Sequence, residues 1–246
     1  MGGTAKEEIL ARLRREILSL QGGQAFPAEE AWDIGLDLGK GVFPGNVFPC
    51  GVIHEFWCAA PEEAAASGGF ITGITRVLMK KRGAVIWVGR DVFPGALSFF
   101  GVEPDRFLFV RTKRLQDTLW AIEEALRYEG LAAVVGEVEA LSFKASRRLQ
   151  LAVEQSGVTG FILLRSAAPP SVSASFARWR IRPLPGLLDE ALPGVGYPCW
   201  HTELLKIRNG KPGAWKIGWK KEAFCLITEE PRLFELQAGN RKAQVG

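Results

Sequence analysis

The stretch LAAVVGEVEALSFKASRRLQLAVEQSGVTGFILL, residues 131–164, decides the fold class. It opens and closes on short runs that are apolar throughout, at 131–135 and 158–164, with a helix-like segment at 145–156 between them. Strands that are apolar on both faces and separated by a helix are typical of a parallel sheet covered by helices on both sides. The stretch therefore predicts a strand–helix–strand unit with a right-handed crossover.

The same alternation extends from this unit toward the N-terminus. Short apolar strands are predicted at 52–57, 84–88 and 107–110, and helix-like segments at 69–81 and 113–128. The second helical segment carries apolar residues at the spacing of a helix with one buried face. These residues are Leu115, Leu119, Ile122 and Leu126. We therefore expect an α/β fold with a mainly parallel sheet flanked by helices.

The pattern changes after residue 165. The run RSAAPPSVS (165–173) has no periodicity and two prolines, and it predicts a flexible surface loop before a strand at 174–182. The next run, 183–198, is rich in proline and glycine and indicates a long irregular connection. Two more strands, about 202–208 and 214–220, flank NGKPG, which is a hairpin signal. We expect a trailing antiparallel β section, and a polar tail from about residue 229.

An amphipathic helix is predicted near the N-terminus, over residues 5–20, and Gly22 and Gly23 end it. Its apolar seam consists of Leu10, Leu13, Ile17 and Leu20. Such a narrow seam can pack on its own domain or on a neighbouring molecule, and the pattern leaves both open. The expected division of the chain is an N-terminal helix (1–23), a core domain that includes the late β section (24–228) and a tail (229–246).

Composition excludes several classes of protein. The chain has 246 residues, 47% hydrophobic and 24% charged, which is ordinary for a soluble globular protein. No apolar run reaches the roughly 18 residues of a membrane span, and the charged N-terminus is unlike a signal peptide, so we expect a cytoplasmic protein. Four cysteines without a CxxC pair, and two histidines, argue against a disulfide scaffold, a structural zinc site and a Ser-His-Asp hydrolase.

The net charge of +4 is unevenly distributed. Residues 178–221 hold nine Lys or Arg and three Asp or Glu, which makes this window +6 and the rest of the chain −2. Within ARWRIR (177–182), Trp179 and Ile181 alternate with three arginines, as in a strand with one buried and one solvated face. The basic residues singled out are Arg178, Arg180, Arg182, Lys206, Arg208, Lys211 and Lys216. They face either water or an anionic ligand, namely DNA or an acidic partner.

The first predicted strand is followed by the position where a nucleotide-binding protein carries its phosphate loop. The sequence there is CAAPEEAAASGG (58–69) in place of GxxxxGK[ST]. It offers no lysine to neutralise phosphate and no hydroxyl at the Mg²⁺ position, and Glu62 and Glu63 repel phosphate. Ser67, Gly68 and Gly69 are interpreted as a helix N-cap and a close packing point. We therefore expect no catalytic residue, no cofactor and no metal.

Several blocks in order resemble a known family. WDIGLDLGKGVFPGNVFPCGVIHEFW (32–57) resembles the entry into a RecA-type core. LWAIEEALR (119–127), SRRLQLAVEQSG (146–157) and ARWRIRP (177–183) are similar to the ImuA family, bacterial RecA-like proteins of the damage-inducible mutagenesis cassette. The resemblance covers roughly residues 32–221. It implies a RecA-like core and an accessory role in error-prone translesion synthesis.

The resemblance also implies site residues and partners. The two glycines of the RecA phosphate loop fall on Cys58 and Glu63, its lysine on Ala64 and its threonines on Ala65 and Ala66, while the acid that ends the Walker B strand falls on Glu137. The implied partners are RecA, the ImuB-like Y-family polymerase homologue and the DnaE2-type polymerase. The seam of the N-terminal helix is the implied docking element for RecA.

Three alternatives remain open at this point. The basic 178–221 region favours a DNA-binding module, and the RecA-like pattern without ATPase chemistry also suits a cell-division inhibitor of the SulA type. A conventional NTPase with a divergent loop is the third, and the sequence CAAPEEAAA argues against it on electrostatic grounds.

Overall fold

The computed structural model describes residues 34–80, 83–89, 94–187 and 196–227. Within them the chain forms one sheet of nine strands, in the order β3-β2-β4-β5-β1-β6-β7-β8-β9. The elements are η2 (Pro44–Asn46), β1 (Ile53–Cys58), α2 (Pro61–Leu78), β2 (Val85–Val88), α3 (Pro94–Phe99), η3 (Pro104–Arg106), β3 (Phe107–Val110), α4 (Leu115–Leu126), β4 (Ala133–Val138), α5 (Phe143–Ser156), β5 (Thr159–Arg165), β6 (Ala177–Leu187), β7 (Tyr197–Ile207), β8 (Gly213–Lys220) and β9 (Ala223–Leu226).

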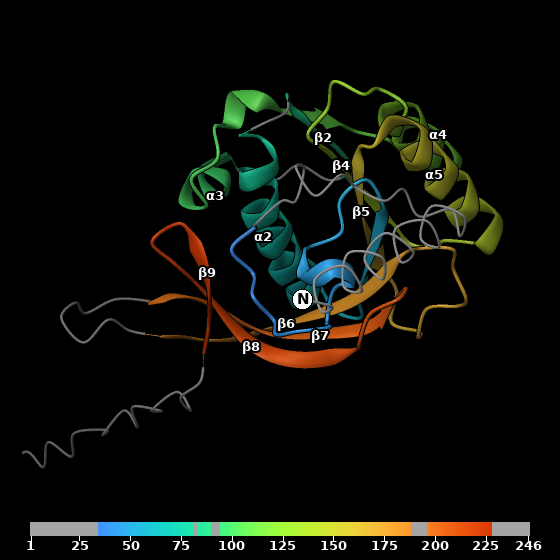
Figure 1. The fold of residues 1–246 in the computed structure, drawn as a ribbon. Coiled ribbons are helices and arrows are strands. Elements are labelled where there is room, and N and C mark those ends of the chain that lie inside the picture. Colours follow the sequence, from blue (N-terminus) through green and yellow to red (C-terminus); the bar gives the residue numbers. More distant parts are fainter. Residues whose placement is uncertain (1–33, 81–82, 90–93, 188–195, 228–246) are drawn as a thin grey trace, which may run out of the picture.

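The first part of the sheet is parallel, which confirms the expected fold class. Strand β1 pairs in parallel with β5 and β6, β4 with β2 and β5, and β2 with β3. Helices α2 and α3 lie on one face and α4 and α5 on the other (Figure 1). Each pair covers a separate apolar cluster, and strands buried from both sides are the reason for their uniformly apolar sequences.

The trailing section is antiparallel, as expected, and β6 joins it to the rest. Strand β6 runs parallel to β1 through Ala177–Trp179 and antiparallel to β7, and β7, β8 and β9 continue antiparallel. The prediction of an irregular connection from residue 183 was wrong in part, because β6 continues to Leu187 and β7 begins at Tyr197. Among the described residues, β6 has no partner strand on the β1 side beyond Trp179, so Pro183 can sit in it without leaving a ladder bond unmade on that side.

Several shorter elements escaped prediction. Helix α3 spans six residues and strand β9 four, too few for either to show a period in the sequence. Helix α5 begins two residues earlier than expected, where the Ser142 hydroxyl accepts a hydrogen bond from the Ala145 N–H at 3.1 Å. It ends at Gly157, whose φ of 68° is the left-handed conformation that suits a helix C-cap.

The core is densest where the sheet curls around α2. Trp179 is fully buried among Phe56, Phe70 and other rings, with centroids about 6 Å apart. A Cβ on Gly73 of α2 would lie 2.8 Å from both Phe224 and Trp219, so only glycine lets β8 and β9 come this close to the helix. The four tryptophans of the 178–221 region are predicted to be core residues, and this is confirmed for Trp179, Trp200 and Trp219, which are buried, while Trp215 is partly buried against the same core.

None of the helices among the described residues is both long and apolar enough to cross a membrane. The predicted N-terminal helix with its seam Leu10, Leu13, Ile17 and Leu20, and the predicted tail from residue 229, lie outside the described residues.

Candidate functional site

The connection from β1 to α2 is only two residues long. Strand β1 ends at Cys58 and α2 begins at Pro61, so the prediction of a loop here with a helix starting at 69 was wrong. Proline suits the first turn of a helix, Glu62 and Glu63 complement its dipole, and alanine is the best helix former. Gly68 and Gly69 are therefore interior helix positions and not a cap.

Those glycines do serve as a packing point, as the sequence suggested. A Cβ on Gly69 would lie 2.9 Å from the Phe100 ring, and one on Gly68 would lie 3.6 Å from the Trp87 ring. The rings therefore reach the helix backbone because α2 has no side chains there. This contact offsets the cost of two glycines inside a helix.

Glu63 is the central residue of this turn. Its side chain is buried, and its Oε2 accepts a hydrogen bond from the Ala59 N–H at 2.9 Å. The Arg180 guanidinium of β6 donates to the same carboxylate, through Nε at 3.2 Å and Nη2 at 2.8 Å. The hydrogen bonds that Arg180 donates to Glu63 raise the pKa of Arg180. The guanidinium also lies over the Trp57 ring, 4.5 Å from its centroid, so it is held on two sides.

In this arrangement a side chain of the protein itself, Glu63, occupies a set of anion-binding donors. A backbone N–H at the start of a helix and a guanidinium are the donors that bind phosphate or carboxylate groups. Here both are bonded to Glu63. An external anion would have to displace a buried carboxylate to reach them.

Cys58 and Ala64 complete the predicted loop positions as core residues. The Cys58 thiol is buried and contacts the Ser67 hydroxyl at 3.5 Å, and burial raises its pKa to about 11. It therefore stays a protonated thiol at neutral pH and is a poor nucleophile. Ala64 is buried, while Ala65 is exposed.

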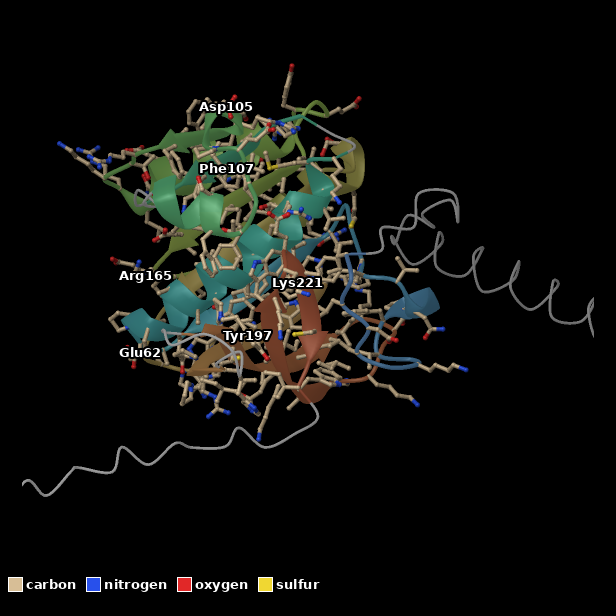
Figure 2. The ribbon with its side chains drawn as sticks, turned by 90° about the vertical axis from the view of Figure 1, so that its left-hand side faces the viewer. Glu62, Asp105, Phe107, Arg165, Tyr197 and Lys221 are labelled. Carbon is tan, nitrogen blue, oxygen red and sulfur yellow. The ribbon has the colours of Figure 1, made fainter. Side chains whose placement is uncertain are left out.

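Glu137 lies at the carboxyl end of β4, where the sequence placed an acid. It accepts a hydrogen bond from the Trp87 indole at 2.9 Å and one from Arg165 at 3.0 Å. Figure 2 shows Arg165 and Glu62 on the same side of the molecule. No group of three potential metal ligands exists among the described residues. The Glu137 carboxylate therefore forms an ion pair with Arg165 of the neighbouring strand β5.

Two cavities open at this edge of the sheet, where parallel α/β proteins bind ligands. One of about 270 Å³ is polar and includes Lys113, Arg114 and Thr118 at the start of α4. The other, of about 480 Å³, lies along α2 and is mainly apolar. Glu137 and Arg165 line both, so their ion pair forms the shared wall.

Each arginine of the basic strand β6 has a carboxylate partner on a different element. Arg178 pairs with Glu55 of β1 at 2.9 Å, Arg180 with Glu63 of α2 at 2.8 Å, and Arg182 with Glu203 of β7 at 3.0 Å. The alternation of the sequence is confirmed, because Ala177, Trp179 and Ile181 are buried between the arginines.

The other predicted basic residues serve different contacts. The Lys206 ammonium donates to the carbonyls of Ser173 and Ser175, at 3.0 and 3.3 Å, and burial lowers its pKa. Arg208 lies over the Phe176 ring, 5.6 Å from its centroid. Lys211 passes beside Gly41, and Lys216 is exposed on β8.

The segment predicted as a flexible loop is tied to this network. Glu55 is 1% exposed and accepts hydrogen bonds from the Ser173 and Ser175 hydroxyls, at 2.6 and 3.0 Å. Arg178 donates to the Ser171 carbonyl at 2.6 Å. Two buried hydrogen bonds and one exposed hydrogen bond therefore hold the end of a segment that has no regular secondary structure.

The comparison with known proteins decides the family. Two curated proteins named Protein ImuA, from two strains of Caulobacter vibrioides, are each 41% identical to this chain over 208 residues, which covers 77% of this chain and 85% of the relative. The chain belongs to the ImuA family. The resemblance found in the sequence is thereby confirmed. No protein-family model matches the chain.

The site of this ImuA-family chain contains residues that sequence reasoning missed. Glu55, Trp57, Trp87 and Arg165 were not singled out, yet they hold the basic strand and the shared wall of the cavities. One signal was available. Strand VIHEFW carries His54 and Glu55 in an otherwise apolar run, and polar residues in a strand covered on both faces require buried partners.

Proposed function

We propose that this protein is a non-catalytic accessory factor of damage-inducible, error-prone DNA repair. It acts by binding RecA and the mutagenic polymerase complex, which contains the ImuB-like polymerase homologue and the DnaE2-type polymerase. Membership of the ImuA family supports the place in this system. The mode of action, binding without ATP chemistry, is supported by the turn between β1 and α2.

One observation carries the non-catalytic part. The Glu63 carboxylate occupies the donors that a phosphate would need, namely the Ala59 N–H and the Arg180 guanidinium. The turn itself spans two residues, too few for a backbone loop that wraps a phosphate. The positions of the lysine and threonine of a phosphate loop are Ala64 and Ala65, which supply neither charge nor a Mg²⁺ ligand.

Calorimetric titration of the full chain with ATP and Mg²⁺ tests this part. We expect no binding heat, because the first turn of α2 presents a carboxylate and no free cation to the nucleotide. RecA titrated in the same buffer serves as the positive control. A saturable heat for this chain would contradict the proposal.

Binding of the purified full chain to RecA and to the ImuB-like protein tests the partner part. We expect capture of both, and we expect Leu13→Asp to weaken the capture of RecA if the seam of the predicted N-terminal helix docks there. Arg15→Asp is the matched control, since it lies on the opposite side of that helix by the 3.6-residue period. Failure to capture either protein would contradict the proposal.

The basic region supports a second contact, with DNA or an acidic partner. The three arginines of β6 are paired with carboxylates, so we propose that the exposed Lys211 and Lys216 contribute more to such a contact than these arginines do. A titration with single-stranded DNA at two salt concentrations tests it. Each lost phosphate contact reduces the salt slope by about 0.7 for a single strand. No binding at ~50 mM salt would exclude DNA as the ligand.

A further inference from the structure

The cavity of about 480 Å³ along α2 has two contrasting walls. The α2 wall is made of small residues, among them Ala64 and Ala65, while the space beside Gly68 and Gly69 is filled by aromatic rings. The adjoining wall is aromatic and includes Trp87, Phe100 and Trp200, which pack on α2 at these glycines. Its volume lies within the range of about 300–1,000 Å³ found for small-molecule sites.

The aromatic wall is fixed in place by its own contacts. The Trp87 indole donates to Glu137 at 2.9 Å, and the Phe100 and Trp200 rings stack with centroids 6.3 Å apart and planes 19° apart. Phe100 also packs against Gly69 of α2, where a Cβ would be 2.9 Å from it. The cavity is therefore preformed, because hydrogen bonding and ring packing fix the positions of the three aromatic side chains.

The charges around the cavity are already compensated. Among the lining residues of the described chain, Glu137 and Arg165 are charged, and they pair with each other at 3.0 Å. The nearby Glu63 carboxylate is bonded to Arg180 instead. A ligand with several negative charges would lose its hydration and gain no unpaired cation from the described lining residues. A neutral ligand loses little, and one acceptor atom on it can face the partly exposed Arg165 guanidinium.

We propose that this cavity binds an uncharged small molecule with a flat aromatic ring. The ring packs on the alanine face of α2, at Ala64 and Ala65, and beside the Trp87, Phe100 and Trp200 rings, and a hydrogen-bond acceptor on its rim points at Arg165. Offset or edge-to-face packing of the ligand ring on these three rings adds to the burial of its apolar surface. This inference goes beyond the proposed function, which concerns protein partners and no small molecule.

Fluorescence titration with N-phenyl-1-naphthylamine, a neutral aromatic probe, tests the inference on the full chain. We expect saturable binding with one site per chain. Ala65→Trp fills the cavity from the exposed side of α2 and should weaken the affinity at least about tenfold. Ala96→Trp fills it from α3 and should do the same, so that a local folding defect on one helix cannot mimic the result. Gln155→Trp adds the same ring on the exposed face of α5 and should bind as the unaltered chain does.

Four outcomes would overturn the inference. They are the absence of saturable binding, equal affinity in Ala65→Trp and the unaltered chain, displacement of the probe by ATP with Mg²⁺, and displacement by the ImuB-like protein. The third would make the cavity a nucleotide site and contradict the proposed function as well. The fourth would make it a docking pocket for a partner side chain, and would leave the proposed function intact.

Discussion

The two faces of strand β6 are built from alternate residues and stabilise the protein in different ways. On one face, Trp179 and Ile181 are fully buried under α2. On the other, Arg178, Arg180 and Arg182 each pair with a carboxylate. The apolar face contributes through the area it removes from water, which does not depend on a particular partner. The charged face is specific, because each guanidinium requires one carboxylate at one place.

The largest effect is expected on the apolar face. Trp179→Ala removes the largest fully buried side chain and leaves a cavity among aromatic rings, so we expect a loss of about 3–5 kcal/mol in the free energy of unfolding. Chemical denaturation measures it. Trp120→Ala is the matched control, since Trp120 is 63% exposed, and it should change the free energy by no more than about 0.5 kcal/mol. Equal effects at both positions would contradict the description of this core.

The next effect concerns the most buried ion pair of the charged face. Arg178→Met leaves the Glu55 carboxylate buried without its cation, and we expect a loss of about 3 kcal/mol by chemical denaturation. The double variant Glu55→Gln with Arg178→Met should recover part of this loss, because no unpaired charge remains. A double variant no more stable than the single one would show that the arginine acts through its packing.

The third effect depends on pH and concerns His54, which is hydrogen-bonded to Trp179 of the apolar face. His54 donates from Nε2 to the Pro49 carbonyl at 2.7 Å and accepts from the Trp179 indole at 3.1 Å, and burial lowers its pKa from 6.5 to about 4. The unfolded chain therefore binds a proton between pH 6.5 and about 4 that the folded chain does not. The contribution of neutral His54 to the free energy of unfolding is therefore fully present above pH 6.5. It falls as the pH drops, by up to roughly 3 kcal/mol at pH 4. Denaturation midpoints of the full chain, measured between pH 6.5 and about 4, check this, and a midpoint that stays constant over this range would contradict it.

The smallest effect is expected at the outer end of the charged face. Arg182 is 43% exposed and Glu203 is 25% exposed, so water screens the ion pair between them. Arg182→Ala should cost under about 1 kcal/mol, measured by the shift in denaturation midpoint. A cost equal to that of Arg178→Met would contradict the gradient of burial along β6.

Much of this fold could be predicted from the sequence because its signals are local. The strand and helix order, the parallel core and the antiparallel section follow from short apolar runs and from their separation along the chain. The period of two on β6 correctly separated Trp179 from its arginine neighbours. The start of α2 was misplaced by eight residues because Ser67, Gly68 and Gly69 resemble the start of a helix, although Pro61 and the alanine run favour a helix that begins earlier.

The candidate site was only partly predictable. The sequence located the turn after β1 and the acid at the end of β4, since both follow a recognisable strand. It did not show that Glu63 would be bonded to Arg180, which lies 117 positions away, or that Trp87 and Arg165 would converge on Glu137. Nothing in a local pattern assigns one of several acids to one of several arginines.

The sequence alone determined the class of fold, the buried face of β6 and the absence of phosphate-binding residue types after β1, because each depends on residue identity and periodicity within one element. The tertiary structure decided which charges neutralise each other and where a preformed cavity remains, since both depend on distances between atoms far apart in the chain. The same Glu63 that repels phosphate as a residue type becomes, in the folded protein, the anion that Arg180 and the Ala59 N–H bind.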